Sequence, residues 1–300
     1  MSVSGAFRPL PRPIRPYPDE TTASFLRRLE NANALIPGQL RHALRSQGEP
    51  WLNTLSAWSG HDPDVLSLAM PQLLRDGDHH FPDRVLAGRP NRTIRGIACR
   101  RCAQARSIGG NIEIYTTHDK VICPRHGLWI GEGTNSCVDQ LPLRDCPEIT
   151  TAWRHHRNLI TRLGRARVRT AWQASSWINW RWYQQARQPR TFRIRHRILS
   201  KNDRIPQKQA AAAAALYLPT AALASVIASP YWEKIAHSRH PQPFLDRIRH
   251  EVTEGWLPPQ GIYDPLRQWM LEDRADDLVS DSISPPGPCG QPHDSPPCDN

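Results

Sequence analysis

Apolar residues recur at helical spacing through the first quarter of the chain. A helix is predicted from Asp19, where acidic and hydroxyl residues precede the first apolar positions, and an Ile-Pro-Gly turn separates it from a helix starting at Gln39. A second pair follows, divided by a Ser-Gly helix end. Residues 19–90 are therefore predicted as a helical, helix-turn-helix-like unit whose last part, 76–90, is a loop. The apolar positions expected on the helices are Phe25, Leu26, Leu29, Ala32, Leu40, Ala43, Leu44, Trp51, Leu52, Leu55, Trp58, Val65, Leu66 and Leu68.

The pattern changes over residues 91–147. β-branched and aromatic residues at 113–117 and 121–122 are typical of short strands, and both stretches lie between pairs of metal-binding residue types. A small β-rich segment inserted between helical regions is therefore predicted here.

Helical periodicity returns after Pro147. Helices are predicted through 153–163, 172–182 and 244–254, whereas 207–218 and 220–228 are expected to be separate helices because Pro219 interrupts the run. Residues 148–279 are predicted as a basic, tryptophan-rich helical domain, and the chain as a whole as mainly α. The tryptophans fit buried helical stripes better than base-stacking positions, in particular Trp153, Trp172, Trp177 and Trp180.

The two ends of the chain differ from the rest in composition. Residues 1–18 alternate proline with arginine and apolar residues, which predicts an extended arm, and 280–300 are rich in Pro, Ser, Gly and Asp, which predicts a disordered tail. The first 20 residues contain no apolar run resembling a signal peptide, so a cytoplasmic location is expected. The most apolar segment, 210–228, is mostly alanine and is predicted to be soluble helix, not a membrane span.

Positive charge is concentrated in one part of the chain. The net charge is +11, and between Glu148 and Asp203 there are twelve arginines, one lysine and no acidic residue. A GC-rich genome explains arginine-rich composition but not this placement, and guanidinium groups match phosphate geometry, so double-stranded DNA is the expected partner. The alternating stretch 192–198 also fits a strand with a solvated arginine face. The residues predicted to contact DNA are Arg165, Arg167, Arg169, Arg193, Arg195 and Arg197.

Four residues have the spacing of a structural zinc site. Cys99 and Cys102 form one pair with two intervening residues, and Cys123 and His126 form another after an insert of twenty residues. Four protein ligands leave no open position for water, so one Zn²⁺ ion with a folding role is predicted.

The other cysteines do not fit this pattern. Cys137 and Cys146 are nine residues apart, which suits neither pair, and they are interpreted as core or free thiols. Cys289 and Cys298 fall in the predicted tail and are interpreted as free thiols.

With these features in place, the chain resembles the TniQ family of transposon target-selection proteins, which includes TnsD. The resemblance covers roughly residues 9–135, and the stretch 221–232 is similar to shorter members of actinobacterial type. Three blocks carry it: Pro16-Tyr-Pro-Asp-Glu-Thr-Thr-Ala-Ser-Phe-Leu-Arg-Arg-Leu29, Leu55-Ser-Ala-Trp-Ser-Gly60, and Cys99-Arg-Arg-Cys102 with Val121-Ile-Cys-Pro-Arg-His-Gly127.

The resemblance implies a DNA-targeting adaptor without catalytic activity. Such a protein recruits an AAA+ ATPase and a transposase to target DNA, in some cases as a homodimer or attached to an RNA-guided complex. No nucleophile triad, paired carboxylates or phosphate-binding glycine loop is evident in the sequence, and no small-molecule substrate is expected. Two alternatives remain: a helix-turn-helix transcriptional regulator that contains zinc, and a protein-interaction scaffold that does not bind DNA.

Overall fold

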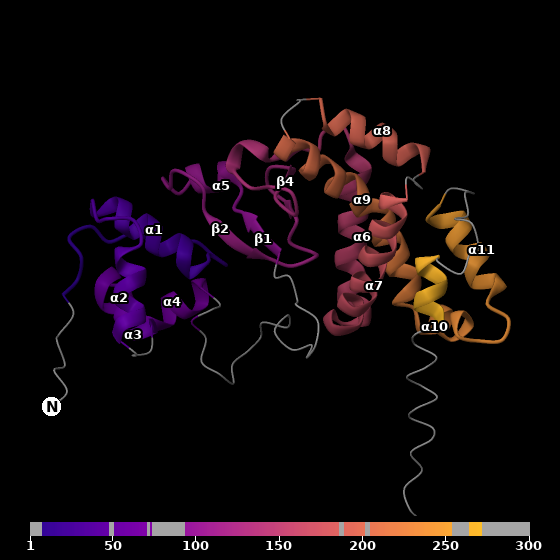
Figure 1. Ribbon diagram of the computed structural model, residues 1–300, viewed down its shortest axis with the longest axis horizontal. Helices are drawn as coiled ribbons and strands as arrows, with labels where there is room; N and C mark the ends of the chain where they lie inside the picture. The colour runs from indigo at the N-terminus through magenta and orange to yellow at the C-terminus, as the bar shows by residue number, and fades with distance from the viewer. Residues whose placement is uncertain are drawn as a thin grey trace, which may run out of the picture.

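The computed structural model describes residues 8–47, 51–70, 73, 94–185, 189–201, 205–253 and 264–271. Figure 1 shows three parts in a row, with α1–α4 at one end, the strands in the middle and α6–α11 at the other end. The prediction of a mainly α-helical chain with few strands is confirmed. The predicted loop 76–90 and the tail 280–300 lie outside the described residues.

The first part, called here the helical unit, consists of four short helices around one apolar core. The carboxylate of Glu30, near the end of the first helix, accepts hydrogen bonds from the backbone N–H groups of Gly38 (2.9 Å) and Leu40 (2.8 Å). It thereby caps the second helix, whose first N–H groups have no partner within their own helix. The helices are α1 (Thr22–Ala32), α2 (Gln39–Gln47), α3 (Trp51–Ser59) and α4 (Pro63–Ala69). Their core is formed by Phe25, Leu26, Leu29, Leu40, Leu44, Leu55, Trp58, Leu66, Met70 and Leu73.

Residues 8–18 have no regular secondary structure and run across the helical unit. The backbone N–H of Leu10 donates to the carbonyl of Trp58 (2.9 Å), and Leu10 and Ile14 pack against the core of the unit. In α4 only Leu66 is buried, whereas Val65 and Leu68 are 47% and 81% exposed, so both of these apolar positions face solvent.

The middle part, residues 94–146, is called here the cysteine segment. It contains an antiparallel pair, in which Ile97 lies opposite Glu113, and a three-stranded sheet in the order β3-β4-β5. Its elements are β1 (Ile94–Ile97), α5 (Arg100–Gln104), β2 (Glu113–Thr116), β3 (Ile122–Cys123), β4 (Leu128–Trp129), the 3-10 turn η2 (Cys137–Asp139) and β5 (Leu141–Pro142).

The last part, called here the C-terminal helices, is organised around one long helix. α9 packs against α6, α7 and α8 and also touches β5 and η2 of the cysteine segment. Gly133 lies directly on α9, where a Cβ atom would come within 2.4 Å of the backbone nitrogen of Ala210. The helices are α6 (Pro147–Leu163), α7 (Arg165–Gln184), α8 (Arg190–Leu199), α9 (Ile205–Ile227), α10 (Pro230–Ala236) and α11 (Gln242–Glu251).

Two sequence expectations are wrong in this part. Pro219 does not divide the apolar stretch, because α9 runs through it; burial of small alanines on both sides outweighs the hydrogen bond that proline removes. The stretch 192–198 is helix and not strand, since Phe192, Arg195 and Leu199 are buried at spacings of three and four.

Within the described residues, one helix is long and apolar enough to cross a membrane. It is the part of α9 spanning Gln207–Ile227, with a mean hydropathy of 1.8. Because 72% of that window is buried inside the protein, α9 has the properties of the core helix of a soluble protein.

Candidate metal centre and arginine-rich helices

The four predicted metal ligands come from two local structures that face each other. Cys99 precedes the first turn of α5 and Cys102 lies within that helix. Cys123 ends β3, and His126 lies in the turn that leads to β4. In this turn the N–H groups of His126 and Gly127 both point at the carbonyl of Cys123, and Gly127 adopts a φ of 58°, which glycine tolerates at little cost.

The distances between the ligand atoms fit a single ion. The Nδ1 atom of His126 lies 3.3 Å from the Sγ atoms of both Cys99 and Cys102 and 3.5 Å from that of Cys123. Cys102 and Cys123 have their Sγ atoms 3.7 Å apart. A tetrahedral ion with bonds of about 2.0–2.3 Å holds its ligand atoms roughly 3.5 Å apart. These four residues can therefore hold one metal ion.

Burial makes the thiols depend on a cation. Cys99 and Cys123 are 3% and 4% exposed. Burial raises the pKa of Cys99, and burial together with the neighbouring thiols raises the pKa of Cys102 to about 12. A bound cation reverses this balance, because it stabilises the thiolate form that ligates metals.

The two remaining cysteines of this segment stay outside the cluster. Cys146 is fully buried in the core between the cysteine segment and α6, and burial raises the pKa of its thiol. Cys137, at the start of η2, is partly exposed. Cys289 and Cys298 lie outside the described residues.

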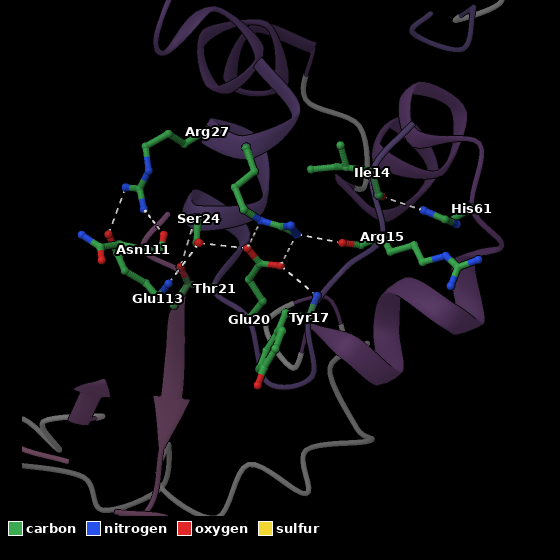
Figure 2. Close-up of polar contacts among 11 residues, drawn as sticks. Ile14, Arg15, Tyr17, Glu20, Thr21, Ser24, Arg27, His61, Asn111 and Glu113 are labelled. Atoms are coloured by element: carbon green, nitrogen blue, oxygen red, sulfur yellow. Dashed lines mark hydrogen bonds and ion pairs between the residues drawn. The ribbon is translucent and has the colours of Figure 1, made fainter. Parts of the chain in front are cut away.

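The cysteine segment is joined to the helical unit by backbone and side-chain hydrogen bonds (Figure 2). The N–H of Thr21 donates to the carbonyl of Glu113 (2.9 Å), and the N–H of Glu113 donates to the hydroxyl of Ser24 (3.1 Å). Arg27 forms an ion pair with the Glu113 carboxylate at 3.0 Å. Glu20 also forms an isolated antiparallel bridge with Ile114, so the start of the helical unit extends the β1–β2 pair.

A buried carboxylate organises this joint. Glu20 is 0% exposed and accepts hydrogen bonds from the N–H of Tyr17, the hydroxyl of Ser24 and the guanidinium of Arg28, all at 2.9 Å. Burial raises the pKa of Glu20 although these partners act in the opposite direction. Figure 2 shows the carboxylate between the chain at Tyr17 and the first turn of α1. The sequence contains Glu20, Ser24 and Arg28 within one motif, but the motif alone does not predict their mutual contacts.

A second joint connects the cysteine segment to the C-terminal helices through stacked rings. His118 Nδ1 lies 3.1 Å from His156 Nε2, and His156 Nδ1 lies 2.8 Å from the hydroxyl of Tyr217. Trp172 stacks on His156 with ring centroids 4.5 Å apart. Burial, with smaller contributions from His118 and Arg165, lowers the pKa of His156 to about 3, so this histidine is neutral at physiological pH. No sequence pattern singles out either histidine.

The first three predicted DNA contacts lie beside this joint. Arg165 makes a two-pronged ion pair with Asp119, at 2.8 and 3.2 Å. Arg167 donates to the carbonyl of Ala228 (2.6 Å) and pairs with Glu233 of α10. Burial alone would raise the pKa of Asp119, but hydrogen bonds from Arg165 and Thr117 outweigh it and lower that pKa to about 2. Arg169 is partly buried in the same helix.

The other three predicted contacts lie in α8. Arg195 is buried, with 7% exposure, whereas Arg193 and Arg197 are exposed and line a groove between α8 and the end of α7. The expectation for the tryptophans is met by Trp153, which is 6% exposed, but not by Trp180, which is 48% exposed. The structure therefore does not bring the six arginines together on one surface.

Comparison with models of protein families, with curated proteins and with solved structures finds no match to this chain. Its own residues are therefore the only basis for a function.

Proposed function

We propose that this chain is a TniQ-like, non-enzymatic DNA-binding adaptor that recruits an AAA+ ATPase and a transposase to target DNA. The observation that carries the proposal is a contact between two motifs distant in the sequence. The opening block over 16–29 and the block that contains the four metal ligands each resemble the same family, and they share one joint.

The contact involves motif residues of both blocks and not only their neighbours in space. Tyr17 of the opening block lies in the same apolar cluster as Cys99, Cys123 and Leu128. Glu20 and Ser24 hold the first turn of α1 against β2, between the two halves of the metal centre along the chain. An accidental likeness in two separate blocks gives no reason for such a joint.

The metal of this adaptor is zinc on the chemistry of its ligands. Three thiolates and one imidazole in tetrahedral arrangement suit Zn²⁺, while Mg²⁺ and Ca²⁺ require oxygen ligands. The four residues complete the coordination, and the segment they hold has only short strands, so the ion stabilises the fold. The conclusion that the helical unit contains a DNA-reading helix-turn-helix, and that the cysteine segment is a zinc finger, belongs to this proposal.

The zinc assignment is tested by elemental mass spectrometry of purified protein. We expect about one zinc per chain, and the double variant Cys99→Ser/Cys123→Ser should lose the metal and the ordered structure of the cysteine segment. Cys137→Ser is the matched control, because this thiol lies outside the cluster, and it should retain zinc. Substoichiometric zinc in the unmodified protein, or zinc retained in the double variant, contradicts the assignment.

The adaptor function is tested by footprinting on duplex DNA at low salt, with and without the ATPase and transposase encoded beside it. We expect the protein to bind duplex DNA with steep salt dependence and to retain the ATPase there. Binding to a defined operator without retention of a partner indicates a transcriptional regulator instead. Retention of the partners without any footprint indicates a scaffold, and either result overturns the proposal.

A further inference from the structure

The groove between the end of α7 and α8 has walls of a distinct chemical kind. It encloses about 570 Å³ and is lined by aromatic, basic and small polar side chains. Its lining consists of Tyr183, Gln184, Phe192, Arg193, His196, Arg197 and Ser200.

Aromatic rings run continuously across this groove. Trp180 stacks on Tyr183 with centroids 5.4 Å apart, Tyr183 meets Phe192 edge-on at 5.6 Å, and Phe192 stacks on His196 at 5.8 Å. The outermost ring, that of Trp180, is 48% exposed. Leaving an indole in water forgoes hydrophobic free energy, which a planar ligand stacked on it would recover.

The charge of the groove is of one sign. Arg193 and Arg197 are four residues apart, so they lie on the same face of α8, and both are exposed. Neither α7 nor α8 contains an aspartate or glutamate, and no carboxylate of the described residues pairs with either arginine. Two unneutralised guanidinium groups beside a row of rings suit a ligand that carries both phosphates and planar bases.

We propose that this groove binds a single strand of nucleic acid, with its phosphates on Arg193 and Arg197 and an unpaired base stacked on Trp180. A duplex satisfies the arginines but keeps the faces of its bases stacked inside, whereas a single strand offers both. This activity goes beyond the proposed recruitment to duplex DNA and does not depend on it.

The test uses the full-length protein and three labelled probes of equal length, each of about twelve nucleotides. These are oligothymidylate, oligouridylate and a DNA duplex, and fluorescence anisotropy gives the affinity for each. We expect Trp180→Ala to weaken single-strand binding roughly tenfold and duplex binding much less, and Trp180→Phe to retain most of the affinity. The tighter of the two single strands identifies whether the ligand is DNA or RNA.

Matched variants separate the groove from general effects of charge and exposure. Arg193→Ala/Arg197→Ala should weaken single-strand binding far more than Arg154→Ala/Arg162→Ala, which removes the same charge from exposed positions of α6. Tyr231→Ala removes an exposed ring of α10 and should have no effect. Thermal melting checks that every variant is folded.

Three results would overturn the inference: equal effects of the two arginine pairs, unchanged single-strand affinity in Trp180→Ala, or an equal loss of duplex and single-strand affinity in that variant. Tighter binding of a labelled polyglutamate peptide than of either strand would overturn it too. These outcomes are independent of whether the protein footprints on duplex DNA or retains an ATPase.

Discussion

Two arginine triplets with the same spacing have different surroundings in this protein. Arg165, Arg167 and Arg169 begin α7, and a second triplet at alternate positions occupies α8. In the first triplet, Arg165 and Arg167 pair with carboxylates. In the second, the middle arginine is buried and the outer two line an open groove.

The difference arises from tertiary structure, because the carboxylates come from elsewhere in the chain. Asp119 belongs to the cysteine segment and Glu233 to α10, and both are brought to the start of α7 only when the chain folds. Successive alternate positions on a helix also point about 200° apart, so no triplet of this spacing can present all its members on one face. The first triplet therefore serves the fold, and the second leaves two cations available for a ligand.

Acidification should have the largest effect on the joint beside the first triplet. Because the pKa of His156 falls from 6.5 to about 3 on folding, the unfolded chain takes up the proton first as pH falls. The stabilisation is complete above about pH 6.5 and is lost by roughly 1.4 kcal/mol per pH unit towards pH 3. Denaturant titrations across this range should show the slope, and His156→Gln should flatten it; an equal slope in both proteins would contradict the assignment.

Removal of the carboxylate partner of Arg165 should have the next largest effect. Asp119→Ala leaves Arg165 without its two-pronged partner and removes the acceptor of Thr117, so we expect about 2 kcal/mol lower stability. Chemical denaturation measures this value. Asp145→Ala serves as the control, since its contact with Lys201 is 3.9 Å long and exposed, and the account fails if the two variants are equally stable.

The pair of Arg167 and Glu233 should contribute least. Both side chains are more than one third exposed, so Glu233→Gln should cost about 0.5 kcal/mol. Duplex affinity should stay unchanged in this variant. A large gain in DNA affinity would instead mean that Glu233 competes with phosphate for Arg167, which would place the first triplet at the DNA surface.

Local pattern and spacing are sufficient to predict several features of the molecule. Helical periodicity predicts α1–α4 and α6, and two-residue spacing predicts the four ligands that the structure brings together. Both signals depend on residues near each other in the sequence, and they retain their meaning in any fold that buries the apolar face.

Features that depend on distant residues do not follow from the sequence in this way. The local preference of Pro219 is to end a helix, but packing of α9 against three other helices overrides it. The spacing of Trp180 favours the core, yet its position in the last turns of α7 lies beyond the core that buries Trp182. The joint of His118, His156 and Tyr217 combines residues about one hundred positions apart, for which a single sequence contains no signal.

The most direct test of the difference between the triplets is the salt dependence of duplex binding in two double variants of equal charge. Arg193→Ala/Arg197→Ala should lower the magnitude of the slope of log affinity against log salt by about 2 without changing the melting temperature. Arg165→Ala/Arg167→Ala should lower the melting temperature and leave the slope unchanged. The opposite assignment, a reduced slope only in the variant of α7, would contradict the account.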